Sequence, residues 1–181
     1  MASSSVQVSE AQFPRDAQVT ATLFLAYAEA LNVDLTFQNF KDELAQLPGK
    51  YAPGNGGALL LAYHQPATDD GTEDATNAGG ASLPLGNCIG CIAIRRHQPN
   101  DVCEFKRLYI IPEARRLGAG AVLISKALDK ARELGYTEAL LDTLSSMVAA
   151  RKLYARYGFE ETEKYYDNPL PNVVYYKAKL V

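Results

Sequence analysis

Apolar residues recur at helical spacing in the first part of the chain. After Pro14, a residue that fits the first position of a helix, a period of 3.6 residues predicts a helix. Its apolar positions are Val19, Leu23, Ala26, Tyr27, Ala30 and Leu31. A second helix is expected from about Thr36 to Leu47, before Pro48 and Gly49 end it. Two helices are therefore expected ahead of the first strand.

Runs of apolar and β-branched residues, bounded by Gly, Pro and Asn, predict the strands of a sheet. The expected strands are 57–65, 88–96, 103–111, 138–144, 159–166 and 173–180. Between the first two, residues 66–87 are rich in small and acidic residues with Gly and Pro. We interpret this segment as a flexible loop inside one domain.

The middle of the chain has the pattern of a strand, a helix and a second strand. Apolar residues keep helical spacing from Val122 to Leu134, and Gly135 is typical of a helix end. A crossover of this kind is right-handed and makes the two strands parallel. A further helix is expected to begin after Ser145 or Ser146, as N-cap, and to end at Gly158. All 181 residues are thus predicted to form one α/β domain.

The charge and hydropathy of the chain indicate which classes of binding partner to expect. The chain carries 18 Lys and Arg against 21 Asp and Glu, a formal net charge of -3. This balance excludes the strong basic field of a protein that binds nucleic acid non-specifically. The sequence shows neither a signal-peptide pattern nor a run of about twenty apolar residues. We therefore expect a cytoplasmic protein with no nucleic-acid and no membrane partner.

The three cysteines raise the question of metal or redox chemistry. Cys88 and Cys91 form a C-x-x-C without a second such pair, and the two histidines are His64 and His97. In a strand, a spacing of three places the two thiols on opposite faces. We expect these two and Cys103 to be buried structural cysteines, and we expect no metal site.

The stretch ARRLGAGAVL, from Ala114 to Leu123, lies between the predicted strand and the predicted helix. The unpaired N–H groups at a helix N-terminus can bind phosphate oxygens. Gly118 and Gly120 would allow close approach, and Arg115 and Arg116 would add charge-assisted hydrogen bonds. The alternative is a plain turn, with glycines for packing and arginines for solubility.

Two known phosphate-binding patterns fit this stretch poorly. The Walker pattern requires Gly-Lys-Ser/Thr, which is absent. The dinucleotide pattern G-x-G-x-x-G begins at Gly118 and Gly120, and Asp142 ends the next strand, where an acid would hold a ribose. Leu123 occupies the third glycine position, however, and the chain has one βαβ unit instead of two successive ones.

A third pattern, R-x-x-G-x-G, is complete from Arg115 to Gly120. Here the chain resembles the GNAT superfamily of acetyl-CoA-dependent N-acetyltransferases, whose pyrophosphate loop follows [QR]-x-x-G-x-[GA]. LYIIPEARRLGAGAVLISKAL resembles the family's strand, loop and helix, and KLYARYGFE, 152–160, resembles its helix ending in a tyrosine, three residues and Gly-Phe. The resemblance is close over 88–159. It implies a mixed, mostly antiparallel twisted sheet of about six to seven strands, with helices on both faces and a splayed parallel pair at the cofactor site.

The resemblance implies that acetyl-CoA binds along the strand and the loop that follow each other here. The implied cofactor-binding residues are Leu108, Tyr109, Ile110, Arg115, Arg116, Leu117, Gly118, Ala119, Gly120 and Ser146. An N–H near Ile110 would face the thioester oxygen and stabilise an oxyanion. Many family members have an asparagine where this chain has Met147, so Ser145 or Ser146 is expected to replace its contact.

The resemblance also implies two catalytic groups, the first of which removes a proton from the acceptor amine. Alternation along a strand places Glu104, Lys106, Leu108 and Ile110 on one face. In several branches of the family a glutamate in the register of Glu104 is the general base, directly or through water. The alternatives are an ion pair with Lys106, Arg107 or another cation, and an acid that only binds substrate.

The second implied group protonates the leaving CoA thiolate. Since a thiol has a pKa of about 8.5, a tyrosine hydroxyl is a sufficient donor. Tyr154, four residues before Gly158, occupies the family's tyrosine position. The alternative is a tyrosine packed in the core with its hydroxyl satisfied.

The family builds its acceptor site from the N-terminal helices and the loop between the last two strands. Tyr165, Tyr166 and Asn168 are expected to line it, unless Pro169 and Pro171 simply shape a tight hairpin. The acceptor is expected to be the amine of a small molecule or a peptide, attacked directly in a ternary complex, by a monomer or a homodimer. The alternative function is a non-catalytic acyl-CoA-binding or protein-interaction module.

Overall fold

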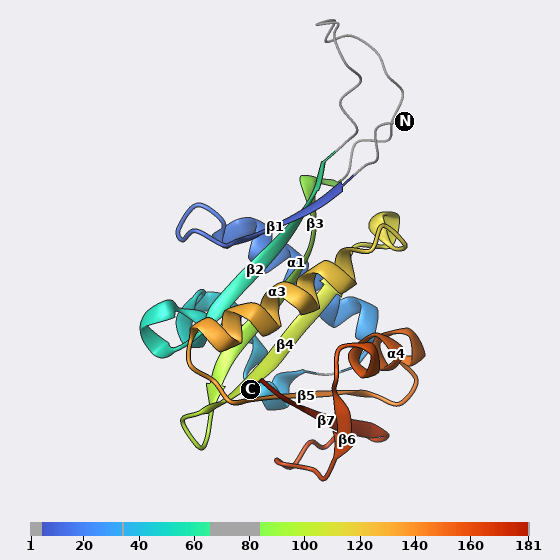
Figure 1. The fold of residues 1–181 in the computed structure, drawn as a ribbon. Coiled ribbons are helices and arrows are strands. Elements are labelled where there is room, and N and C mark those ends of the chain that lie inside the picture. Colours follow the sequence, from blue (N-terminus) through green and yellow to red (C-terminus); the bar gives the residue numbers. More distant parts are fainter. Residues whose placement is uncertain (1–4, 34, 66–83, 181) are drawn as a thin grey trace, which may run out of the picture.

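A seven-stranded mixed sheet with the strand order β1-β2-β3-β4-β5-β7-β6 forms the centre of the computed structural model, which describes residues 5–33, 35–65 and 84–180 (Figure 1). Its strands are β1 (Ser5–Glu10), β2 (Ala58–Gln65), β3 (Pro84–His97), β4 (Val102–Ile110), β5 (Glu138–Leu144), β6 (Glu160–Thr162) and β7 (Val173–Lys179). The helices are α1 (Ala17–Leu31), α2 (Phe40–Ala45), α3 (Ala119–Glu133) and α4 (Val148–Arg156). Short 3-10 turns are η1 (Thr36–Gln38), η2 (Gly49–Tyr51), η3 (Pro53–Asn55) and η4 (Pro112–Ala114).

Helices cover both faces of the sheet, as the resemblance implied. In Figure 1, α3 crosses in front of β2, β3 and β4, whereas α1 lies behind them. The inward side of α3 has the predicted helical period, and its buried residues include Leu123, Ile124, Ala127 and Ala131. None of the helices in the described ranges is both long and apolar enough to cross a bilayer.

The parallel strands β4 and β5 separate soon after they meet. Val102, Cys103 and Glu104 pair with Glu138, Ala139 and Leu140, and the register ends there although both strands continue. The other neighbouring pairs of the described sheet are antiparallel. The predicted mixed sheet with a splayed parallel pair is therefore confirmed.

Several predicted boundaries are wrong at the ends of the chain. β1 precedes α1, so the fold does not begin with two helices. Asn39 has a φ of 54° and interrupts the predicted second helix, which divides into η1 and the short α2. The strand expected over 159–166 shrinks to β6, because the chain leaves the sheet after Thr162 and turns back toward the centre of the molecule.

Two further boundaries change near the predicted loop and the last helix. Of the loop expected over 66–87, residues 66–83 lie outside the described residues, whereas 84–87 belong to β3. Met147, and not Ser145 or Ser146, precedes the first turn of α4, and it makes no side-chain capping bond.

The three cysteines are free thiols buried in or beside the core, as predicted. Burial raises the pKa of Cys88 to about 11 and that of Cys103 to about 12, and it raises the pKa of Cys91 further. Because thiolates are the reactive form, these cysteines are unreactive near neutral pH.

Candidate active site

A bulge in β4 sets the direction of the side chains at the centre of the molecule. The register with β3 pairs Ala93 with Lys106 but Cys91 with Tyr109, so β4 holds one residue more than its neighbour. Arg107, at the bulge, has a φ of 60°. Tyr109 therefore shares the face of Lys106, and Ile110 falls on the opposite face. The prediction that Glu104, Lys106, Leu108 and Ile110 share one face is wrong, because strict alternation ends at Arg107.

A pocket fills the gap where β4 and β5 diverge. The residues around it include Tyr27, Lys106, Leu108, Asp142, Met147 and Tyr154. Because the strands stop pairing here, backbone groups on the facing edge of β4 have no partner strand. We call this gap the cofactor seam. It brings a predicted catalytic tyrosine and a predicted cofactor-binding strand together.

Tyr154 enters the seam from α4. Its ring lies 5.9 Å from that of Phe159 and 6.0 Å from that of Tyr176, and it is 7% exposed. Its hydroxyl makes no hydrogen bond with another of the described residues. Burial raises the pKa of Tyr154 well above its usual value, so the hydroxyl stays protonated at neutral pH.

The loop between β4 and α3 presents a row of free backbone donors. Within the described part of the chain, the N–H groups of Arg116, Gly118, Ala119 and Gly120 donate to no carbonyl, whereas Leu117 N–H donates to Ala114 O. Arg116 and Gly118 have φ values of 77° and 80°, which turn the chain into the helix. Such a run of amides at a helix N-terminus fits a pyrophosphate.

The two glycines of this loop have different reasons to be glycine. Gly118 has open space where a side chain would begin, and its positive φ is what favours glycine. At Gly120 an added Cβ would lie 3.2 Å from Leu153 Cδ2, so the lack of a side chain lets α3 and α4 pack closely. Arg115, beside them, is exposed.

Of the remaining predicted cofactor-binding residues, Leu108 borders the seam, and Tyr109 and Ile110 follow it at the end of β4. Ile111 N–H donates to Ile89 O at 3.0 Å, so the backbone groups of the preceding Ile110 point away from β3 and toward β5. Ser146 is exposed in the turn before α4. Met147 lines the seam, and its Sδ accepts a hydrogen bond of 3.5 Å from Thr143 Oγ1.

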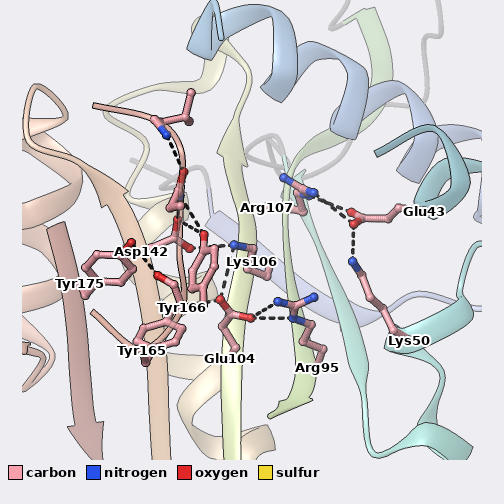
Figure 2. A network of polar contacts seen from close by, with 12 residues as sticks. Glu43, Lys50, Arg95, Glu104, Lys106, Arg107, Asp142, Tyr165, Tyr166 and Tyr175 are labelled. Carbon is pink, nitrogen blue, oxygen red and sulfur yellow. Dashed lines mark hydrogen bonds and ion pairs between the residues drawn. The ribbon is translucent and has the colours of Figure 1, made fainter. Parts of the chain in front are cut away.

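Glu104 is completely buried and held by three side chains (Figure 2). Its Oε2 accepts a hydrogen bond of 2.6 Å from Arg95 Nε, and its Oε1 lies 3.5 Å from Lys106 Nζ. Tyr165 donates its hydroxyl to Oε1 at 2.9 Å. These contacts match the ion-pair alternative with Lys106 and a further cation, which is Arg95. No surface of Glu104 is left for direct contact with an amine.

The loop between β6 and β7 places side chains against Asp142, and Figure 2 shows Tyr165 and Tyr166 beside it. Asp142 accepts hydrogen bonds from Tyr166 Oη at 2.8 Å and Asn168 Nδ2 at 3.1 Å, and Lys106 Nζ lies 2.7 Å from its Oδ1. Burial alone would raise the pKa of Asp142, but Lys106 and these donors hold it below its usual value. Tyr165 thus contacts Glu104, whereas Tyr166 and Asn168 contact Asp142, so all three residues lie against the buried carboxylates.

Arg107 does not pair with Glu104, which was one of the alternatives, but with Glu43 of α2. The guanidinium donates to the two carboxylate oxygens at 2.8 and 3.1 Å, and Lys50 Nζ lies 2.5 Å from Oε2. Burial acts to raise the pKa of Glu43, but Arg107 and Lys50 outweigh it and lower the pKa to about 2. This pair fastens α2 to β4.

Sequence reasoning named Lys106 as a possible ion-pair partner of Glu104 but missed Arg95 and Asp142 as parts of the site. A signal was present, because β4 places Glu104, Lys106 and Arg107 within an otherwise apolar buried strand. Buried charges require partners. Arg95, Asp142 and Glu43 lie on other elements of the fold, so only the folded chain identifies them as the partners.

The comparisons with known proteins agree with this geometry. The acetyltransferase (GNAT) family matches residues 58–159. An uncharacterized N-acetyltransferase of Schizosaccharomyces pombe is 35% identical over 180 residues, which cover 99% of this chain and 98% of that protein.

Two solved structures show the same fold at low sequence identity. A GNAT-family acetyltransferase from Staphylococcus aureus superposes with a TM-score of 0.71 at 17% identity, over 98% of this chain and 100% of that one. An acetyltransferase from Salmonella typhimurium, solved with its cofactor acetyl-CoA, superposes with a TM-score of 0.65 at 15% identity, over 98% and 95% of the two chains. Together with the splayed strands and the family match over more than half of the chain, these relatives show that the chain belongs to the GNAT family of acetyltransferases.

Proposed function

We propose that this acetyltransferase transfers an acetyl group from acetyl-CoA to a primary amine of a small molecule or a peptide, by direct attack in a ternary complex. The observation that carries the proposal is the cofactor seam. There the pairing of β4 and β5 ends after three residue pairs, and Tyr154 borders the gap. The same strand then leads through a short loop into the free amides at the start of α3.

Acetyl-CoA supplies the acetyl group, and its CoA part leaves as the thiolate. The chain has suitable groups for each part of this molecule. The free amides of Arg116, Gly118, Ala119 and Gly120 fit the pyrophosphate, and Arg115 adds a positive charge at the surface. The backbone of Leu108, Tyr109 and Ile110 has an edge available to the pantetheine arm, with Ser146 across the seam. The Tyr154 hydroxyl donates its proton to the thiolate.

Glu104 is proposed to act on the acceptor only indirectly, through the Tyr165 hydroxyl or a water molecule, because it is itself fully buried. The cations beside it assist the same step. Arg95 and Lys106 disfavour a second positive charge nearby, so an amine that enters next to them loses its proton more easily. Tyr166 and Asn168 are proposed to close the acceptor side from the β6–β7 loop.

Acetyl-CoA binding is the first prediction. At a concentration 100 times its Kd, acetyl-CoA is expected to stabilise the protein by about 2.7 kcal/mol, which corresponds to roughly 5–10 °C in melting temperature for a chain of this size. Arg115→Ala is expected to raise the Kd about tenfold at low salt and less at high salt, measured by calorimetry. The control is Arg96→Ala. Arg96 is also exposed, but it lies near the end of β3 and not in the loop between β4 and α3. An unchanged melting temperature would remove the basis of the proposal.

The role of Glu104 is the second prediction. Glu104→Gln is expected to lower kcat about tenfold and to leave the KM for acetyl-CoA unchanged, because the path that takes up the amine's proton is lost. The matched variant Tyr165→Phe should lower kcat in the same way. If both variants lower the melting temperature and leave kcat of the folded protein unchanged, Glu104 serves only as an ion-pair partner.

A further inference from the structure

A second pocket adjoins the cofactor seam on the side of α2. It has a volume of about 250 Å³, and Gln38, Asn39, Lys50, Arg95, Lys106 and Tyr166 lie around it. Lys106 also borders the cofactor seam, so the two spaces meet at this side chain. We call this space the acceptor-side pocket. It is large enough for a small amine and lies next to the proposed site of transfer.

In each of the two ion pairs beside the acceptor-side pocket, the cation is partly exposed and the carboxylate is buried. The Lys50 side chain is 35% exposed while its partner Glu43 is 2% exposed, and the Arg95 side chain is 31% exposed while its partner Glu104 is not exposed at all. Each carboxylate therefore lies behind its cation. A ligand in the pocket meets the positive partners, although the pairs are neutral when counted together.

Several donors and one polar atom around the pocket still lack a partner. Arg95 uses Nε and Nη2 on Glu104, which leaves Nη1 without a bond to the other described residues. The Lys50 ammonium has three donors and contacts one carboxylate oxygen. Gln38 Oε1 is buried with no hydrogen-bond partner in the part of the chain that the structure describes. A bound polar group would satisfy such atoms.

Negative charge is scarce in the lining of the acceptor-side pocket itself, whereas Asp42 and Glu43 line a neighbouring pocket on the side of α2 that shares Lys50 and Arg95. Among the described residues that line the pocket, the one acid is Asp167. Its side chain is 93% exposed and pairs with Lys164, 2.9 Å away, on the outer side of the β6–β7 loop. A polycationic acceptor would thus find no buried carboxylate free to receive it.

From this arrangement we infer that the acceptor is a primary amine that also carries an anionic group, a carboxylate or a phosphate, bound between Lys50 and Arg95. The inference rests on the proposed function and names its substrate class. With the anion held there, the amine points toward Lys106 and the cofactor seam. The same cations then lower the pKa of the amine, which favours its reactive neutral form.

The test uses pairs of amines that differ in the anionic group. The pairs are 4-aminobutyrate with butylamine and 2-aminoethyl phosphate with ethanolamine, and spermidine serves as a polycation. Binding is measured by calorimetry on the protein saturated with CoA, which cannot transfer an acetyl group, and acetylation is followed separately by CoA release. The member of at least one pair that carries the anionic group is expected to bind about tenfold more tightly than the member that lacks it. The pair that shows the preference identifies carboxylate or phosphate.

The variant Lys50→Gln assigns the effect to the pocket. It is expected to weaken binding of the amine that carries the anionic group about tenfold and not to weaken binding of the partner that lacks this group, while Lys50→Arg retains most of the preference. The control Lys41→Gln removes the same charge from an exposed position of α2 outside the pocket. Melting temperatures of the variants show whether each is folded.

The outcomes separate this inference from the proposed function. Equal binding within both pairs, no binding by any amine, or an equal effect of Lys50→Gln on both members would overturn the inference, even if amines that lack an anionic group are acetylated. If anionic amines bind with the expected dependence on Lys50 but no CoA is released with any amine, the anion site stands and the proposed function fails.

Discussion

Replacing Tyr154 with phenylalanine is expected to lower kcat for acetyl transfer by at least about 100-fold, the loss typical for a missing acid or base in a transition state. The substitution removes one hydroxyl that makes no hydrogen bond with the other described residues. The ring contacts with Phe159 and Tyr176 remain, so the fold and the KM for acetyl-CoA should change little. An effect confined to kcat would place the hydroxyl in the transition state.

The measurement compares kcat and KM of the variant with those of Tyr157→Phe. Tyr157 is the next tyrosine along the chain and is half-buried at the end of α4, but it does not border the cofactor seam. Its substitution should leave kcat within about twofold of the unmodified enzyme, since only contacts in the transition state change kcat. Normal turnover by Tyr154→Phe across the pH range would show that the thiolate takes its proton from elsewhere.

The sequence predicted the elements that follow local patterns. The strand expected at 138–144 coincides with β5, because its apolar run is bounded on both sides. The helix after the glycine loop was predicted because its apolar stripe is regular. β1 was missed because its regular alternation contains only two apolar residues, Val6 and Val8, and because an edge strand is stabilised by its partner β2 rather than by its own residues.

The candidate site could be predicted only where a motif specifies local geometry. A motif of this kind predicted two parts of the site, which are the loop from Arg115 to Gly120 and the side chain of Tyr154. The bulge at Arg107 is not visible in a sequence, because one extra residue leaves the apolar pattern almost unchanged, yet it reverses the faces of Tyr109 and Ile110. The partners of buried charges are set by tertiary contacts. Glu43 and Arg107 are 64 residues apart, so no local pattern connects them.

Glu43→Gln is expected to lower the free energy of unfolding by about 3–5 kcal/mol, since it leaves the buried charge of Arg107 without its counter-ion. The side chains of Glu43 and Arg107 are only 2% and 1% exposed, so water cannot replace the lost partner. Arg107→Met should cost a similar amount. The double variant Glu43→Met with Arg107→Met should recover much of the loss, because it leaves no unpaired charge in the interior.

The pH dependence of unfolding provides an independent test of the same pair. Folding depresses the pKa of Glu43 from 4.5 to about 2, so its contribution is complete above pH 4.5 and is lost as the pH falls toward 2. The shift corresponds to about 3 kcal/mol. Denaturant titrations between pH 7 and about pH 3 should therefore show a steeper loss of stability in the unmodified protein than in the double-Met variant. Parallel curves for the two proteins would mean that Arg107 and Lys50 do not hold Glu43 in its charged form, and that α2 is fastened to β4 by packing alone.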